Sequence, residues 1–309
     1  MIRSLLTISI TKIKMTDKLR ILKIVTLSIV ILTGISSCSA DSDWTPLLDK
    51  NLSHWENYLS YKLSEGYNGE QPRDKNGELI SPIGYNKNVN NVFSIIEENG
   101  VPVLKVSGEI YGCVFTKQEF ENYHLKLKVK WGNIKWDPRK DKLKDSGILY
   151  HSIGECGIDY WRSWMLSQEM QIMEGHIGDY WSIANSAIDV KALIPEGIMN
   201  PIASEKQNFL SIGSGTGMDG FCLRSEDRES PLGEWTEVEL ICFEDKSLHI
   251  VNGQVVMVLR NSRYFENGKK IPLTRGKIQL QSEAAEVYFK DIKIRDLKSI
   301  PDSFSSYFD

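Results

Sequence analysis

Apolar and polar residues alternate in short runs along most of the chain, and a period of two residues is typical of β-strands with one face in a core. The clearest run is Tyr123–Trp131, in which Leu125, Leu127 and Val129 would face the core while His124 and three lysines face the other side. About a dozen such runs recur at spacings typical of sandwiches, and no long amphipathic helix is indicated. The pattern predicts an all-β fold, an antiparallel two-sheet sandwich of jelly-roll type.

Turn signals mark the ends of several predicted strands. Asn252-Gly253 between two apolar runs predicts a hairpin over residues 247–259. Val92–Ile96 and Val101–Val106 predict a second hairpin. The segment Glu65–Asn91, rich in Gly, Asn, Pro and charge, predicts a long surface loop, a kind of segment that is often functional.

The N-terminal segment predicts export. Lys18, Arg20 and Lys23 precede the apolar run Ile24–Ile35, which is too short for a comfortable membrane span. The following Ile-Ser-Ser-Cys38 resembles a bacterial lipobox, whose cysteine becomes the lipidated first residue; the alternative is a plain signal peptide with an incidental cysteine. We expect an exported protein, lipid-anchored to the cell envelope, with a lipoprotein signal at 1–37, a tether at 38–43, one domain at 44–297 and a loose tail at 298–309.

Charge and cysteine content narrow the class of protein further. The chain has 37 basic and 41 acidic residues, and because the signal holds six of the bases and one acid, the exported part has a formal net charge of about −9. Nucleic acid is therefore not an expected partner, since phosphate contacts need clustered cations. The cysteines after Cys38 lack any paired C-x-x-C spacing, and Cys113 and Cys242 lie within apolar strands, where buried free thiols are expected.

The most informative stretch runs from Asp145 to Trp181. In Ser167–Met173 the side chains of Glu169 and Gln171 would point to one face of a strand, while the intervening apolar residues point to the other. This face carries a carboxylate and an amide, and tryptophans flank it. A polar row on a sheet with aromatic residues at its rim is suited to binding a sugar.

Five motifs in order resemble the 3-keto-disaccharide hydrolase domain family. They are DSGILYH, QEMQIMEG with GDYW, GEWTEVEL, HIVNGQVV and GKIQLQSEAAEVYFKDIKIRDL. The resemblance covers about Trp44 to Leu297. It implies a jelly roll similar to concanavalin-type lectins and glucanases, an exported bacterial protein, and a glycoside substrate whose sugar is a ketone at carbon 3. That ketone would come from an upstream sugar 3-dehydrogenase.

Cleavage beside a ketone needs a base for the carbon 2 proton, an oxyanion stabiliser and an acid for the leaving oxygen. Glu169 is the first candidate base, because partial burial would raise the proton affinity of its carboxylate. The alternative is a surface or salt-bridged glutamate. His151 is the other acid–base candidate, since imidazole titrates near neutral pH, and a structural histidine is its alternative. Glu283 is the candidate second carboxylate, with a turn residue as its alternative.

Further residues are candidates for substrate binding. Gln171 and Gln281 would offer amides, and Tyr150 a hydroxyl, although Tyr150 and His151 point to opposite faces of a regular strand. Lys130 could stabilise an oxyanion, or could simply be solvated. Asp179 and Trp181 follow a glycine in a turn that would close one side of the pocket, with Trp181 stacking on a pyranose ring. Trp161 and Trp164 could stack on sugar or pack in the core.

No cofactor or metal is expected, because neither an H-E-x-x-H motif nor an acidic calcium loop is present in the sequence. Two functions remain open. One is an enzyme that cleaves 3-keto-glycosides, by hydrolysis or by elimination, and the other is a noncatalytic, lectin-like carbohydrate-binding domain, because fold alone does not settle function. A conventional glucanase is a weaker option, since no E-x-D-x-x-E run is present.

Overall fold

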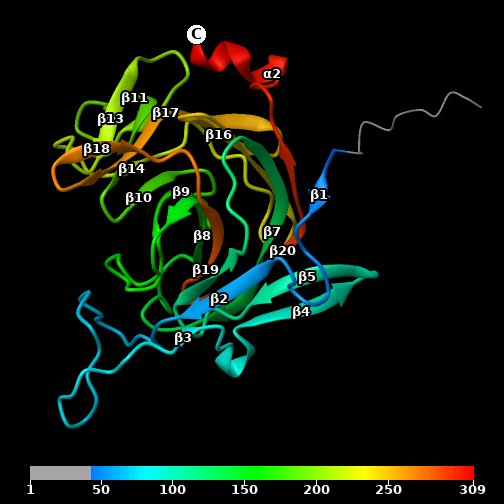
Figure 1. Cartoon of the computed structure of the whole chain (residues 1–309), viewed down its shortest axis with the longest axis vertical. Helices are drawn as coiled ribbons and strands as arrows, with labels where there is room; N and C mark the ends of the chain where they lie inside the picture. Colours follow the sequence, from blue (N-terminus) through cyan, green and yellow to red (C-terminus); the bar gives the residue numbers. More distant parts are fainter. Residues whose placement is uncertain (1–42) are drawn as a thin grey trace, which may run out of the picture. The chain divides into compact units, whose positions relative to one another are not determined.

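Two antiparallel sheets make up the part of the chain that the structure describes, residues 43–309 of a computed structural model (Figure 1). The predicted signal at 1–37, Cys38 and the tether up to residue 42 lie outside the described residues. The larger sheet has the order β12 (Ile202–Ala203), β11 (Ser186–Leu193), β17 (Gln254–Glu266), β16 (Lys246–Val251), β15 (Thr236–Phe243), β7 (Tyr123–Lys135), β20 (Ala285–Asp296), β5 (Val101–Val106) and β4 (Phe93–Glu98). Three short strands join it, β1 (Thr45–Pro46) on β20, β13 (Phe209–Gly213) on β11 and β18 (Lys269–Pro272) on β17.

The smaller sheet carries the central stretch of the sequence. Its order is β14 (Phe221–Cys222), β10 (Tyr180–Ile183), β9 (Leu166–Met173), β8 (Asp145–Ile153), β19 (Lys277–Ser282), β6 (Gly112–Thr116), β2 (Trp55–Leu59) and β3 (Gly84–Tyr85). The long loop between β2 and β3 extends away from both sheets (Figure 1). The fold is thus the two-sheet, nearly all-β sandwich that the alternating pattern predicts.

The main core lies between the two sheets. Leu125, Leu127 and Val129 of β7 are buried in one apolar cluster together with Met170 and Ile172 of β9. This agrees with the two-residue period of both strands, and it confirms which face of β9 packs inward. Each fully buried aliphatic side chain of this kind contributes roughly 1.5–3 kcal/mol through removal of apolar surface from water.

Strand register decides which side chains share the outward face of the smaller sheet. Glu169 of β9 lies opposite Leu149 of β8 on one side and opposite Trp181 of β10 on the other, and Gln171 lies opposite Gly147. Directly opposite residues in an antiparallel sheet present their side chains on the same face. Because β19 pairs with the other edge of β8, its polar residues extend this face.

Both predicted hairpins are present. β4 and β5 pair across a turn at Asn99-Gly100, and β16 and β17 pair across Asn252-Gly253. Asn252 and Gly253 both adopt positive φ angles, 47° and 77°, which is the backbone conformation that favours the Asn-Gly pair in a tight hairpin.

The last residues correct the expectation of a loose tail. They form helix α2 (Asp302–Ser305) and the short 3-10 helix η2 (Ser306–Phe308), and Phe304, Tyr307 and Phe308 pack against a small apolar cluster on the larger sheet. The sequence pattern does not reveal this because the segment is only two short turns long. Within residues 43–309, no helix has the length and apolar content to cross a membrane.

Deleting residues 302–309 is expected to lower the thermal midpoint. Loss of three partly buried aromatic contacts should cost roughly 1–3 kcal/mol, equivalent to several degrees in a domain of this size (about 2–4 °C per kcal/mol). Differential scanning calorimetry measures the change, and the exposed Ser306→Ala is the matched control. An unchanged midpoint in the deletion variant would mean that the tail contributes nothing to stability.

Candidate active site

A cavity of about 550 Å³ opens on the outward face of the smaller sheet. Carboxyl groups form its floor, and aromatic side chains form two of its sides. We call it the acid pocket, and its floor comprises Arg139, Asp145, Glu169, Gln171, Gln281 and Glu283. Glu169, Gln171, Gln281 and Glu283, which the sequence analysis named on three separate grounds, therefore line one cavity.

Glu169 lies deep in the acid pocket, with 4% of its surface exposed. Burial raises the pKa of its carboxyl well above the ordinary value, and the nearby carboxyl of Asp145 adds to the increase. Within residues 43–309 no ion pair reaches it. Space for it is provided by Gly147 on β8, because a Cβ there would lie 2.0 Å from Glu169 Oε1 and 2.5 Å from Gln281 Oε1.

Arg139 is the cationic residue on the floor of the acid pocket. Arg139 forms ion pairs of 2.5 Å with Asp145 and 3.6 Å with Glu283. Burial opposes its charge, but the carboxylates of Glu283 and Asp145 outweigh that effect and raise the pKa of the guanidinium. Burial also raises the pKa of Asp145 to about 6, against the opposing effect of Arg139, and raises that of Glu283 well above its ordinary value.

Two amides lie beside these acids with unused hydrogen-bonding atoms. Gln171 Nε2 donates to Asp145 Oδ1 at 2.9 Å, but Gln171 Oε1 is buried without a partner among the described residues. Both amide atoms of Gln281 are likewise buried and unpartnered there. A buried polar group without a partner costs about 1–3 kcal/mol, so a group of them in one cavity indicates a place where a polar ligand binds.

Aromatic residues form two opposite walls of the acid pocket. On one side Trp181, 41% exposed, packs on Phe221 with ring centroids 4.4 Å apart. On the other side Trp161 is stacked between Tyr67 and Tyr111, at 5.5 Å and 5.2 Å. Flat apolar rings that flank a polar floor are suited to the faces of sugar rings.

The loop that carries the second wall is held by the partly buried carboxylate of Asp159. Asp159 accepts hydrogen bonds from the backbone N–H groups of Trp161, Ser163 and Trp164 at 2.9–3.0 Å. Trp164 is buried and Trp161 is partly exposed, and both line the cavity; because Trp161 stacks on Tyr67 and Tyr111, it closes this side of the cavity without presenting a free ring face.

Asp179 lies behind the cavity rather than on its surface. It is fully buried and contacts His176, which does line the acid pocket, at 2.9 Å. Contrary to its prediction as a substrate-binding residue, Asp179 does not line the cavity and is linked to it through His176.

Three predicted residues lie away from the acid pocket. His151 has φ of 52° at an irregularity in β8, which turns it into a buried site beside Tyr123, and burial lowers its pKa to about 4. Tyr150 is in the main core, where its hydroxyl contacts Ser247 at 3.0 Å. Tyr150 follows the regular alternation onto the core face, together with Ile148, whereas the irregularity turns His151 away, so neither side chain reaches the cavity.

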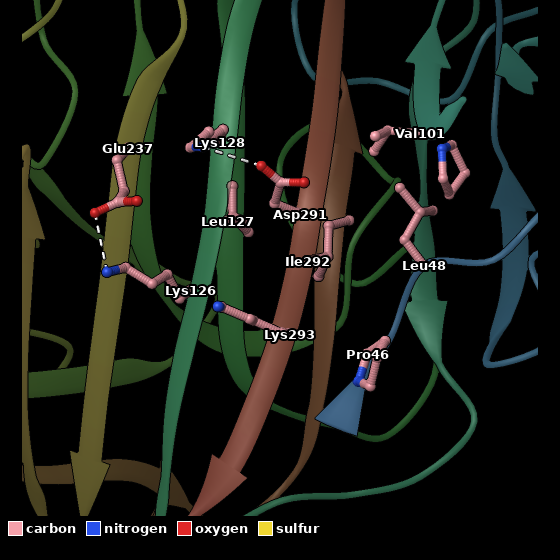
Figure 2. A pocket seen from close by; sticks show the side chains of 11 residues that line it. Pro46, Leu48, Val101, Lys126, Leu127, Lys128, Glu237, Asp291, Ile292 and Lys293 are labelled. Atoms are coloured by element: carbon pink, nitrogen blue, oxygen red, sulfur yellow. Dashed lines mark ion pairs between the residues drawn. The ribbon is translucent and has the colours of Figure 1, made fainter. Parts of the chain in front are cut away.

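Lys130, the third, lies on the outer face of the larger sheet. Its ammonium pairs with Glu98 at 3.2 Å and lies 4.5 Å from the ring centre of Trp235. A smaller cavity of about 350 Å³ lies on the same sheet, and Figure 2 shows its lining, where Lys126 pairs with Glu237 and Lys128 with Asp291. The lysines of the alternating strand thus form a solvated, ion-paired face, and such pairs contribute little.

Sequence reasoning missed three groups in the acid pocket. Arg139 belongs to an irregular loop between β7 and β8, and His176 belongs to the turn before β10, so neither follows a strand period. Asp145 begins the DSGILYH motif, and its place at the start of a strand next to that of Glu169 is the signal that could have found it.

The described residues show no disulfide and no metal-binding group. Cys113, Cys156, Cys222 and Cys242 are all free thiols, which confirms the expectation for Cys113 and Cys242. Among residues 43–309 no three His, Cys, Asp or Glu side chains are arranged to hold a metal ion.

Comparison with known proteins adds a family. The model of the 3-keto-alpha-glucoside-1,2-lyase-like domain matches residues 43–295. Two similar crystal structures are candidate glycosyl hydrolases from Parabacteroides distasonis, one with 20% identity over 82% of this chain and 99% of its own (TM-score 0.43), the other with 18% identity over 83% and 94% (TM-score 0.42). A third is the carbohydrate-binding module CBM66 from Bacillus subtilis, with 7% identity over 66% and 92% (TM-score 0.36). A search of curated proteins finds no match.

Glu169→Gln is expected to stabilise the fold at high pH. Because the pKa of Glu169 is raised on folding, the folded state binds more protons than the unfolded state, so stability falls as pH rises from about 4.5 through the folded pKa. The neutral amide removes this loss. We expect thermal midpoints that are equal at pH 4 and roughly 5 °C higher for the variant at pH 8.

The exposed Glu234→Gln serves as control and should follow the wild-type curve at every pH. A midpoint for Glu169→Gln that is lower than wild type at pH 8 would show that the carboxylate is stabilised, not destabilised, in the folded protein.

Proposed function

The chain belongs to the 3-keto-alpha-glucoside-1,2-lyase-like domain family, and from this premise we propose that it cleaves the glycosidic bond of sugars oxidised to a ketone at carbon 3. Cleavage proceeds by removal of the carbon 2 proton and elimination at carbon 1. Addition of water to the unsaturated product then gives the outcome of hydrolysis.

One observation carries this proposal: the carboxyl of Glu169 is buried, has no ion-pair partner among the described residues and faces a cavity beside the unpartnered amide atoms of Gln281 and Gln171 Oε1. A carboxyl with a raised pKa is a stronger base than an ordinary glutamate once it is ionised. The proton on carbon 2 is weakly acidic only because of the adjacent ketone, so a strong base is what the reaction needs.

Gln281 and Gln171 support the same step. Removal of the carbon 2 proton places negative charge on the ketone oxygen, and a fixed N–H donor lowers the free energy of that state. Gln281 Nε2 is buried without a partner among the described residues, so it is the donor we assign to this oxygen. The carbonyl of Gln171 is left to accept from a sugar hydroxyl.

Arg139 keeps the other two acids in place. By pairing with Asp145 and Glu283, Arg139 offsets the electrostatic repulsion between these acids and allows both to lie close to Glu169. The negative charge of Asp145 in turn raises the pKa of Glu169, after the larger effect of burial. Asp145 therefore tunes the base, while Glu169 carries out the proton transfer.

The aromatic walls define the substrate class. Trp181, which packs on Phe221 and is 41% exposed, offers a ring face to a sugar on one side of the acids, and the stacked Trp161 closes the other side. A disaccharide or a short glycoside fits this arrangement. A sugar 3-dehydrogenase acting earlier would supply the ketone.

The activity test compares wild type with Glu169→Gln on a 3-keto-disaccharide, with released monosaccharide measured by chromatography. General-base catalysis contributes typically 100- to 10,000-fold, so the variant should lose about that factor in kcat/KM. The wild-type rate should rise with pH as the Glu169 carboxyl ionises. Glu234→Gln is again the control and should keep wild-type turnover.

Two results would count against the proposal. Full turnover by Glu169→Gln would remove the assigned base. Binding of the 3-keto-disaccharide without any product from the wild-type protein would favour a noncatalytic, lectin-like role, for which the same cavity and tryptophans are suited.

Anchoring is a separate part of the proposal, supported by the lipobox resemblance at Cys38. In a bacterial host, labelled palmitate should enter the wild-type protein, and detergent should be needed to release it from membranes. Cys38→Ser should abolish both, while Cys156→Ser, a change at a partly exposed cysteine within the fold, should alter neither. Label that persists in Cys38→Ser would show that the lipid is attached at another residue.

A further inference from the structure

His176 lies at the acid pocket on the tight turn between β9 and β10. Its backbone N–H donates to Met173 O at 2.7 Å, and Gly178 N–H donates to Gln171 O at 2.9 Å, so the turn is fixed directly onto the strand that carries Glu169. The imidazole lines the same cavity, and its side chain is 33% exposed. It therefore lies nearer the cavity mouth than Glu169 does.

A buried carboxylate fixes the orientation of this imidazole. His176 Nδ1 lies 2.9 Å from Asp179 Oδ2. The other oxygen of Asp179 accepts from Arg224 N at 2.9 Å and from Arg224 Nη1 at 3.1 Å. A carboxylate at Nδ1 selects the tautomer with hydrogen on that nitrogen, which leaves Nε2 as the nitrogen that exchanges a proton with a ligand in the cavity.

Arg224 completes the support and distinguishes this arrangement from a surface pair. Its guanidinium also donates to Gly175 O on the same turn. Its Nη1 lies 3.3 Å from His176 Nδ1, which is a contact and not a hydrogen bond while Nδ1 carries hydrogen. Asp179 is fully buried. A histidine held by a buried acid, with its second nitrogen free to face a cavity, is the usual geometry of an acid–base catalyst.

We propose that His176 is the proton donor to the departing glycosidic oxygen, with Asp179 as its positioning residue, an inference that rests on the proposed function. Glu169 takes the carbon 2 proton, and the C–H electron pair forms a C2=C3 bond with charge on the ketone oxygen. Collapse restores C3=O, forms C1=C2 and breaks the C1–O bond. The leaving oxygen keeps that pair and takes the proton from His176 Nε2.

The protons balance in this step without any further reactant. After the step His176 is neutral and Glu169 is protonated, and transfer of one proton between them through water restores the starting state. Glu169 is buried at the floor of the cavity, whereas the side chain of His176 is 33% exposed. This difference suits their roles, because the oxidised ring must reach Glu169 while the leaving group extends toward the mouth of the cavity.

The test uses two 3-keto-glucosides that differ in leaving group. In the 3-keto-disaccharide the leaving group is a hydroxyl oxygen of the second sugar, which is a poor leaving group and needs a proton donor. In the 4-nitrophenyl 3-keto-glucoside the leaving group is 4-nitrophenolate, which leaves readily without one. His176→Asn, whose amide can still donate to Asp179, should lose about 100- to 10,000-fold in kcat on the disaccharide. On the nitrophenyl substrate it should lose less than about 10-fold.

Three further variants separate this role from others. Asp179→Asn should show the same selectivity with a smaller loss, as expected of a positioning residue. Glu169→Gln should lose activity equally on both substrates, because both require removal of the carbon 2 proton. The exposed His54→Gln, away from the cavity, should leave both rates unchanged.

Equal losses on the two substrates in His176→Asn, or no loss on either, would overturn the assignment. His176→Gln provides a second variant, and thermal midpoints of both check that the turn still folds. If wild type cleaves neither substrate, the proposed function fails and this assignment fails with it; if wild type cleaves both and the selectivity is absent, only the role of His176 fails.

Discussion

The site depends on a shortage of positive charge: the guanidinium of Arg139 is the ion-pair partner of Asp145 and Glu283, and Glu169 beside them has none. In water such a cluster would ionise completely at neutral pH. Burial makes that unfavourable, so protons are retained and the pKa of Glu169 rises well above its ordinary value. The chemical property that the site needs is thus produced by the electrostatics of a partly neutralised, buried acid cluster.

The sandwich makes this arrangement tolerable because β8 and β9, two central strands of the smaller sheet, are buried on both faces along nearly their whole length. Met170 and Ile172 pack into the core on one side of β9, and that packing offsets the cost of holding an uncompensated acid on the other side. Gly147 contributes by having no side chain, since any Cβ there would collide with the carboxyl of Glu169. Stability and reactivity are therefore carried by opposite faces of the same strands.

Strand periodicity accounts for what the sequence could predict. The alternation in β9 correctly assigned Met170 to the core and Glu169 to the outward face. It could not find Arg139 or His176, because loop residues have no period and their positions are set by long-range contacts. It misplaced His151 because a local irregularity, invisible in the letters, reverses the expected direction of the side chain. Lys130 was misplaced because periodicity identifies a face of a strand but not the sheet to which that strand belongs.

The most direct test is a titration of the glutamate side-chain carboxyl carbons by NMR in protein labelled with carbon-13 at that position. The account predicts two resonances that belong to carboxyls protonated at neutral pH and titrate far above the ordinary range of glutamate, those of Glu169 and Glu283, of which the Glu169 resonance disappears in Glu169→Gln. If every glutamate carboxyl in the folded protein were fully ionised by pH 6, the acids would not share their protons in the way described, and the base would have to be sought elsewhere.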